Sequence, residues 1–259
     1  MEGKKEKLNK IRDIIRHDLS YTESGKNFNF LNGELQKKYN IIDTDNVSSN
    51  IYDPIALSII EEHSSGLILD CGSGKRSIYY ANVVNFEIVP YDTTDVLGVG
   101  EELPFIDNVF DAVFSLSVLE HVKNPFKCAS EISRVMKPGA TLYCVVPFLQ
   151  PLHGYPHHYY NMSMQGLKNL FDDYLQIEKQ EVIASGLPIF TLTWFLQSWL
   201  SSLDGDAKNE FLKMTVADLT GNPIDYFERK FVKELSEEKK VELASTTALI
   251  GKKPAIPIH

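Results

Sequence analysis

The stretch from Leu67 to Lys75 (LILDCGSGK) constrains the fold of this chain more than any other. Three apolar residues lead into Asp70, and a Gly-x-Gly turn follows at Gly72 and Gly74. A short apolar run that ends in turn residues is typical of a buried strand. Glycine has no Cβ, so the backbone of such a turn can pass close to a ligand. Ligands of α/β sheets bind beyond the carboxyl ends of the strands, so this stretch predicts one wall of a nucleotide-like site.

The chain after Leu67 alternates between strand and helix patterns, which predicts an α/β fold with a doubly wound, mostly parallel sheet. A helix is expected from Asn124-Pro125 to about Met136, and Lys137-Pro138-Gly139 stops it, because proline cannot continue a helix. The β-rich stretch 241–251 is expected to close a seven-stranded sheet as an antiparallel C-terminal edge strand. The other predicted strands are 67–70, 83–88, 95–99, 111–116, 140–146 and 174–183.

The remaining segments predict helices and loops. Residues 4–19 have apolar residues at helical spacing and predict an amphipathic helix, whereas the polar stretch 20–50 predicts a loop or a small cap. Asp53-Pro54 is expected to open a helix to about Glu62, with aspartate at the N-cap. Further helices are expected at 164–171, 189–203, 207–219 and 224–239.

Composition narrows the function classes. The net charge of −9 argues against a nucleic-acid partner, because binding a phosphate backbone needs clustered Lys and Arg. No apolar run reaches the eighteen or so residues of a transmembrane segment, and the lysine-rich N-terminus is unlike a signal peptide, so the cytoplasm is the expected compartment. The three cysteines, Cys71, Cys128 and Cys144, form neither a disulfide framework nor a zinc motif; Cys128 and Cys144 are expected to be small core residues.

Four predicted strand ends supply polar residues for one pocket. The first is the Asp70–Gly74 turn, and the second is an acid that could accept hydrogen bonds from both ribose hydroxyls. Glu87 and Asp92 both remain candidates for this acid, with Glu87 preferred because a loop must fit before the next strand. The third and fourth are Gly98–Glu101 and Ser115–His121.

The motifs LILDCGSG, EELPFIDNVFDAVFSLSVLEHV and EISRVMKPGATLYCVVP resemble those of the class I S-adenosylmethionine-dependent methyltransferases, most closely the type 11-like branch. The resemblance covers about residues 50–175 and implies the Rossmann-like methyltransferase fold and S-adenosyl-L-methionine as cofactor. It implies that Asp70, Gly72 and Gly74 face the methionine part, that Glu87 or Asp92 binds ribose, and that Val99, Gly100 and Glu101 flank adenine. The complete set of cofactor-binding candidates is Asp70, Gly72, Ser73, Gly74, Glu87, Asp92, Val99, Gly100, Glu101 and Ser115.

Three features depart from the family pattern. Arg76 stands where a third glycine is usual, only residues 75–86 separate Gly74 from Glu87, and Val99 replaces an acid that often contacts adenine. A dinucleotide-binding enzyme is a poorer match, because its motif wants a glycine where Ser77 stands and a long helix after it.

The loop 147–161 is expected to lie at the ligand end of the sheet and holds the candidate catalytic residues His153, His157 and His158. A histidine there could act as the base for a hydroxyl acceptor. The alternatives are that the rings only pack and shape the pocket, or that they bind a metal. No metal site is predicted, because the loop has no carboxylate and adjacent histidines rarely ligate one ion. His121 is expected to have a structural role.

We therefore expect an N-terminal helix and cap at 1–50 and a methyltransferase domain at 51–259, with 189–239 as a helical insertion over the acceptor site. The predicted function is methyl transfer by in-line displacement to a small molecule or a glycan precursor. A similar histidine-rich loop occurs in bacterial relatives associated with glycan biosynthesis. The alternative is a catalytically inactive cofactor-binding scaffold in a biosynthetic complex.

Overall fold

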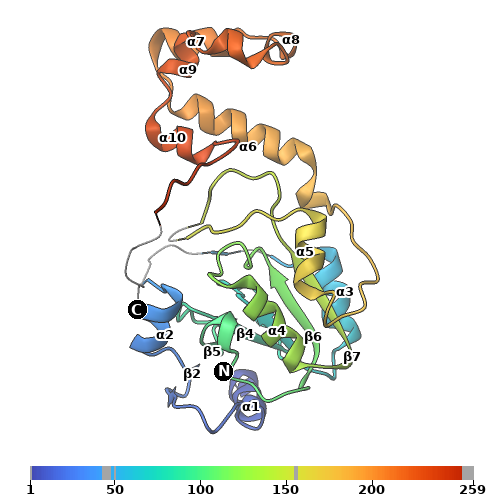
Figure 1. Ribbon diagram of the computed structural model, residues 1–259. Coiled ribbons are helices and arrows are strands. Elements are labelled where there is room, and N and C mark those ends of the chain that lie inside the picture. The colour runs from blue at the N-terminus through green and yellow to red at the C-terminus, as the bar shows by residue number, and fades with distance from the viewer. Residues whose placement is uncertain (1, 43–47, 50, 155–156, 253–259) are drawn as a thin grey trace. The chain divides into compact units, whose positions relative to one another are not determined.

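The computed structural model describes residues 2–42, 48–49, 51–154 and 157–252. The chain divides into two compact units, each described here by itself (Figure 1). The first comprises residues 1–148 and 154–181, and the second comprises residues 149–153 and 182–259. Within the described residues, no helix combines the length and the apolar character needed to cross a bilayer.

The first unit is built on a seven-stranded sheet with the order β1-β2-β5-β4-β3-β6-β7, which confirms the predicted α/β fold with a mostly parallel sheet. Only the β1–β2 pair is antiparallel. The strands are β1 (Thr22–Glu23), β2 (Phe28–Asn29), β3 (Ile68–Cys71), β4 (Val83–Glu87), β5 (Val96–Leu97), β6 (Phe110–Leu116) and β7 (Met136–Val145).

Helices cover both faces of this sheet (Figure 1). One face of the central strands, including Leu69 and Val84, packs against α1 (Glu2–Arg12), α4 (Pro125–Val135) and α5 (Met164–Phe171). The other face, including Ile68 and Val83, packs against α3 (Pro54–Glu62). Successive side chains of a strand point to opposite faces, so buried apolar runs such as Ile68-Leu69 supply both cores. The remaining elements of this unit are α2 (Gly33–Tyr39) and the 3₁₀ turn η1 (Gly100–Glu102).

Local sequence signals set the helix ends correctly. The Asp53 side chain accepts a hydrogen bond from the Ala56 amide and starts α3, as predicted. Asn124 does the same for α4 through the Lys127 amide. The predicted helix at 164–171 is confirmed as α5 with Ser163 at its N-cap.

The helix predicted at 4–19 ends earlier, at Arg12. Ile15 instead forms an antiparallel bridge with Phe105, and the Arg16 amide donates to the Pro104 carbonyl. The Ile14 carbonyl accepts from the Ile106 amide, so neither it nor the Arg16 amide is available for another helical turn. Residues 20–50 also hold more structure than the predicted loop, because β1, β2 and α2 form there. Strands of two residues are too short for any periodicity to reveal.

The sequence predicted an antiparallel edge strand at the C-terminus, and this position is wrong. The antiparallel edge strand is β1, at the N-terminal side, whereas Val241 and Glu242 end helix α10 (Glu237–Glu242) and the described residues after it form no strand. Residues 174–183 also form no strand. Strand propensity becomes a strand only where a neighbouring strand accepts its hydrogen bonds, and β7 pairs with β6 alone.

The second unit is helical. The helices expected at 207–219 and 224–239 are broken into shorter pieces around a small core of Leu203, Ala207, Phe211 and Phe231. Its elements are η2 (Ala184–Gly186), α6 (Pro188–Ser201), α7 (Gly205–Leu212), α8 (Val216–Leu219), η3 (Pro223–Tyr226), α9 (Lys230–Lys233) and α10. The prediction that residues 189–239 cover an acceptor site stays a prediction.

Candidate functional site at the carboxyl ends of the strands

The glycine turn after β3 is hydrogen-bonded to the end of β4. The amides of Gly72 and Ser73 both donate to the Phe86 carbonyl, at 2.9 and 3.0 Å. The Gly74 amide donates to Glu87 Oε2 at 2.8 Å. The turn and the acid at the end of the next strand, which the sequence placed in one pocket, are therefore in direct contact.

Both glycines of the turn are required by their surroundings. Gly72 and Gly74 have φ angles of +84° and +60°, a backbone region that costs other residues energy. A Cβ on Gly72 would lie 2.5 Å from the Val118 side chain, and a Cβ on Gly74 would lie 2.7 Å from the Ser48 carbonyl oxygen. The Lys75 amide also donates to that oxygen, at 2.7 Å. The sequence predicted that a ligand would lie close to the backbone of this turn. In the structure, Val118 and Ser48 of the protein itself lie against it.

Asp70 lies at the end of β3 and is fully buried. Its Oδ2 accepts hydrogen bonds from Tyr52 at 2.5 Å and from Arg76 Nε at 2.9 Å. The Arg76 guanidinium also stacks 4.1 Å from the centre of the Tyr52 ring. Burial raises the pKa of Asp70, and the nearby Arg76 charge opposes this shift. Arg76, the departure from the glycine pattern, therefore neutralises the first acid of the motif.

The two acids proposed for ribose binding lie in different surroundings. Glu87 lies at the end of β4, where its two carboxylate oxygens accept from the amides of Gly74 and Ile88, each at 2.8 Å. Burial raises the pKa of Glu87, and these two hydrogen bonds oppose the shift. Asp92 is exposed, and its backbone carbonyl accepts from Lys4 of α1. Glu87, not Asp92, is in contact with the glycine turn.

The residues proposed to flank adenine pack against α4. Val99 is buried, and a Cβ on Gly100 would lie 2.7 Å from the Cys128 sulfur. The Glu101 carboxylate accepts from the Asn124 amide at 3.2 Å, at the N-terminus of α4, and burial raises its pKa. A carboxylate is favourable at that end of a helix. Cys128 is a core residue as predicted, and Cys144 packs against the same core while only partly buried.

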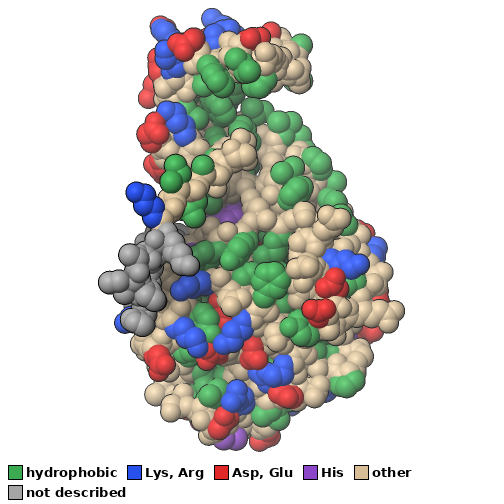
Figure 2. All heavy atoms as spheres, viewed as in Figure 1, with side chains coloured by type: hydrophobic (Ala, Val, Ile, Leu, Met, Phe, Trp, Pro, Cys, Tyr) green, Lys and Arg blue, Asp and Glu red, His purple; other side chains and the backbone are tan. Residues whose placement is uncertain are grey.

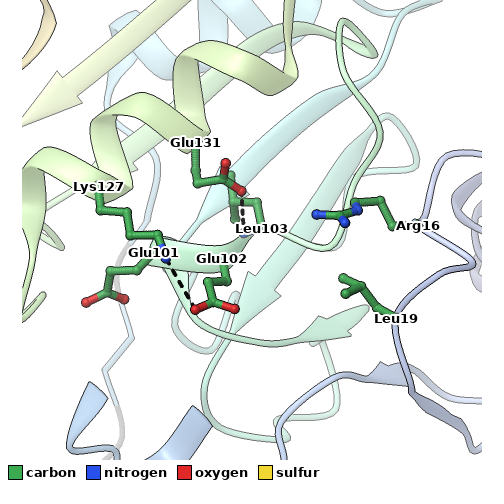
Figure 3. A pocket seen from close by; sticks show the side chains of 7 residues that line it. All are labelled: Arg16, Leu19, Glu101, Glu102, Leu103, Lys127 and Glu131. Atoms are coloured by element: carbon green, nitrogen blue, oxygen red, sulfur yellow. Dashed lines mark hydrogen bonds and ion pairs between the residues drawn. The ribbon is translucent and has the colours of Figure 1, made fainter. Parts of the chain in front are cut away.

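A cavity of about 250 Å³ lies beside η1 (Figure 3). Glu101 is the one cofactor-binding candidate that lines it, and its other charged groups serve the protein itself. Glu102 pairs with Lys127, and Glu131 accepts from the Leu103 amide at 3.0 Å. Ligand pockets commonly measure about 300–1,000 Å³, so this cavity is small for a nucleoside-sized molecule.

Glu120 is a candidate that the sequence interpretation missed. Its side chain is fully buried, and neither carboxylate oxygen has a hydrogen-bond partner among the described residues. Burial raises the pKa of Glu120 to about 8. Buried polar groups without partners are rare in proteins, so this carboxyl group lacks a donor that a ligand could supply. The available sequence signal was an acid directly after the apolar residues Val118 and Leu119.

Ser115 shares this property, because its hydroxyl is buried and has no partner among the described residues. It lies in β6, two residues before Ser117, whose φ of 56° is unusual for a residue other than glycine. Strained backbone of this kind tends to occur at functional sites. Asp70 Oδ1 is likewise buried and unpartnered. Among the described residues, most of the buried side-chain atoms without a hydrogen-bond partner therefore lie at or near the carboxyl ends of β3 and β6.

The three candidate catalytic histidines are divided between the units. His157 and His158 belong to the first unit, where His157 Nε2 lies 2.9 Å from the Asn40 carbonyl and His158 Nε2 lies 2.9 Å from Asn161 Oδ1. His153 belongs to the second, where its ring lies 5.2 Å from that of Trp194. His121 Nδ1 lies 2.6 Å from the His157 carbonyl, which fits the structural role expected for His121.

The available acceptors suit the donors of S-adenosylmethionine. Its amino group needs an acceptor such as Asp70 Oδ1, which has no partner among the described residues. Its ribose hydroxyls need acceptors such as Glu87, whose carboxylate oxygens have further lone pairs besides those that accept from the Gly74 and Ile88 amides. The amides of the glycine turn already donate to the protein, so side-chain oxygens are the better candidates for polar contacts.

The sheet and its glycine turn define a Rossmann-like α/β domain with a nucleotide-type site. Residues 69–144 match the family model of a methyltransferase domain. This segment is therefore similar to a methyltransferase domain.

Individual proteins match parts of this chain. Cycloartenol-C-24-methyltransferase 1 of Oryza sativa subsp. japonica is 37% identical over 54 residues, covering 19% of this chain and 16% of that protein. An uncharacterized protein of Methanocaldococcus jannaschii is 32% identical over 110 residues, covering 37% and 48%. The chain thus spans less than half the length of these relatives. Phosphoethanolamine N-methyltransferase 2 of Haemonchus contortus in complex with S-adenosyl-L-methionine is 17% identical, with a TM-score of 0.39, covering 66% and 48%.

Proposed function

We propose that this protein is an S-adenosylmethionine-dependent methyltransferase that acts on a small molecule or a glycan precursor in the cytoplasm. The observation that carries this proposal is the 2.8 Å hydrogen bond from the Gly74 amide to Glu87. This bond connects the glycine turn after β3 to Glu87 at the end of β4. Both lie within residues 69–144, the segment that matches the methyltransferase family model. An acid and a glycine turn at neighbouring strand ends are the two parts that a nucleoside-type ligand needs.

Each part has a separate role in binding. Asp70 would accept from the amino group of the methionine part, and Glu87 would accept from the ribose hydroxyls. Arg76 holds Asp70 in place through the buried ion pair and keeps its charge balanced. When bound, the cofactor supplies a methyl group on a positively charged sulfur. The protein has to align the acceptor in line with that methyl group and exclude water.

A hydroxyl acceptor also has to lose its proton, and four residues are candidates for the base. His153, His157 and His158 remain candidates on residue type. Glu120 joins them because its carboxyl group is buried and has no hydrogen-bond partner among the described residues. Its pKa is also raised to about 8, close to the pH at which a base is most useful.

Calorimetry with S-adenosylhomocysteine tests cofactor binding. The wild-type protein should bind, and Gly72→Arg should not, because a large side chain would collide with Val118 in the turn. Glu87→Gln should weaken binding, whereas the matched control Asp92→Asn should leave it unchanged, since the Asp92 side chain is exposed. Failure of the wild-type protein to bind would contradict the proposal.

Transfer of labelled methyl groups to a fractionated cell extract tests catalysis. We expect a labelled fraction, and we expect at least one of His153→Ala, His157→Ala, His158→Ala and Glu120→Gln to slow labelling about a hundredfold, the loss typical of removing a general base. Equal rates in all four variants would show that none of these residues is the base. Cofactor binding with no labelled fraction would favour the scaffold alternative.

A further inference from the structure

The second unit contains a long segment without charge. Residues 182–203 include no Asp, Glu, Lys, Arg or His, and the segment lies between Glu181 and Asp204. Most of it forms helix α6, Pro188–Ser201. A helix on the surface of a globular domain normally carries charged residues on its outer face, and α6 has none.

The first two turns of α6 expose their apolar side chains, which Figure 2 shows gathered over this part of the helix. Five of the seven residues from 188 to 194 are apolar and exposed, and the other two are threonines. The exposed fractions are 59% for Ile189, 56% for Phe190, 55% for Leu192 and 36% for Trp194, and Pro188 is also exposed. Contiguous exposed apolar surface of this kind marks an interaction site.

These side chains surround the helix. At about 100° per residue, Pro188, Leu192, Ile189, Phe190 and Trp194 follow one another around the axis, with no gap wider than about 120°. A flat protein partner covers one stripe of a helix, whereas an apolar medium covers all of its sides at once. The all-round distribution therefore favours lipid over a flat protein surface.

The other half of α6 is fixed within its own unit. Trp199 donates from Nε1 to the Phe231 carbonyl at 3.0 Å, and its ring stacks on Phe211 with centroids 5.7 Å apart. Leu196 and Leu200 pack against the same core. The exposed N-terminal half thus extends from an anchored helix, which lowers the entropy cost of placing it in another phase.

We propose that the N-terminal half of α6, residues 187–194, inserts into the surface layer of a lipid bilayer and holds the protein there as a peripheral membrane protein. The whole helix is about 21 Å long at 1.5 Å per residue, too short for a hydrocarbon core of about 30 Å, so it enters the bilayer without spanning it. Because the protein carries a net charge of −9, apolar burial and not attraction to anionic lipid drives the binding. The inference does not depend on methyl transfer.

Flotation of the full chain with phosphatidylcholine vesicles tests the proposal. The wild-type protein should float with the vesicles at both low and high salt, and added phosphatidylglycerol should not strengthen binding. The double variant Phe190→Asp/Leu192→Asp should lower the bound-to-free ratio at least about tenfold, since two large apolar side chains no longer enter lipid. The matched control Val216→Asp/Ile224→Asp changes two residues that are 78% and 66% exposed and should bind like the wild type.

Tryptophan fluorescence gives a second measurement. The chain has two tryptophans, so in Trp199→Phe only Trp194 reports, and its emission should shift to the blue on addition of vesicles. The proposal is overturned if the wild type does not float, or if the α6 variant floats equally well. It is also overturned if the lipid-free protein self-associates through these residues and vesicles do not compete, because that result assigns the helix to a second copy. Calorimetry with S-adenosylhomocysteine on the same samples reports the proposed enzymatic function separately.

Discussion

Arg76 Nη2 lies 2.8 Å from Asp70 Oδ2 in an ion pair whose side chains are 4% and 0% exposed. Arg76 stands where the family pattern has a third glycine, and Asp70 directly precedes the glycine turn region, so the ion pair connects these two positions of the motif. An arginine at this position is therefore compatible with the turn, because its side chain is used inside the fold.

Arg76→Met should destabilise the protein by about 3–5 kcal/mol, because it leaves a buried carboxylate without its counter-charge. Urea unfolding measures the loss. Adding Asp70→Asn to Arg76→Met should recover part of the stability, since the unpaired charge is then gone. If the single variant loses less than about 1 kcal/mol, the ion pair does not hold the turn.

Glu120 should make stability depend on pH. Its pKa in the folded protein is about 8, raised from 4.5 by burial, so the folded state keeps its proton where the unfolded state has lost it. Stability should then be greatest below about pH 4.5 and fall by roughly 3–4 kcal/mol as the pH rises to 8. Urea midpoints of the wild type and Glu120→Gln across this range should show the smaller fall in the variant.

Glu178→Gln is the matched control, because Glu178 is exposed and its substitution should leave the pH profile unchanged. Parallel profiles for the wild type and Glu120→Gln would mean that folding does not raise the pKa of Glu120.

Gly72→Ala should cost more stability than Gly139→Ala. Both glycines have positive φ, +84° and +82°, so both substitutions strain the backbone by about 1 kcal/mol. Only at Gly72 would the new Cβ also collide with Val118, whereas nothing lies within 4 Å at Gly139. We expect an additional loss of about 1–3 kcal/mol in urea unfolding. Equal losses would show that Val118 moves away freely.

Lys7 joins α1 to the sheet. Its Nζ lies 2.7 Å from Asp95 Oδ2 and donates to the Val83 carbonyl at 2.5 Å. Burial lowers the pKa of Lys7 to about 8, and Asp95 opposes this shift. Lys7→Met should destabilise the protein by about 3–5 kcal/mol, because Asp95 is then buried without its counter-charge.

Lys10→Met, at an exposed position of the same helix, should change stability by less than about 0.5 kcal/mol. The pH profile offers a further check. Between about pH 8 and 10.5 the unfolded state holds the Lys7 proton that the folded state has released, so wild-type stability should rise with pH there, and the rise should be absent in Lys7→Met.

Short sequence patterns, each only a few residues long, were enough to predict the central strands and the helices beside them. Apolar runs with turn residues marked β3, β4 and β6, and N-cap residues such as Asp53 and Asn124 marked α3 and α4. The glycine turn and Glu87 were found because strand ends of a parallel sheet meet at one edge. These features depend on nearest neighbours in the chain, so one sequence is enough to find them.

The other features of the fold and the site depend on contacts between residues that are far apart in the sequence. Residues 241–251 have high strand propensity, yet their described part forms no strand, whereas Phe28 and Asn29 form strand β2 because they pair with β5. Arg76 could be recognised as a departure, but only the fold showed that it reaches Asp70. The sequence by itself determined the strand, the glycine turn and the family of the central segment. The tertiary structure alone decided the sheet edge, the Arg76–Asp70 pair and the burial of the Glu120 carboxyl group, because burial and pairing arise only when distant residues come together.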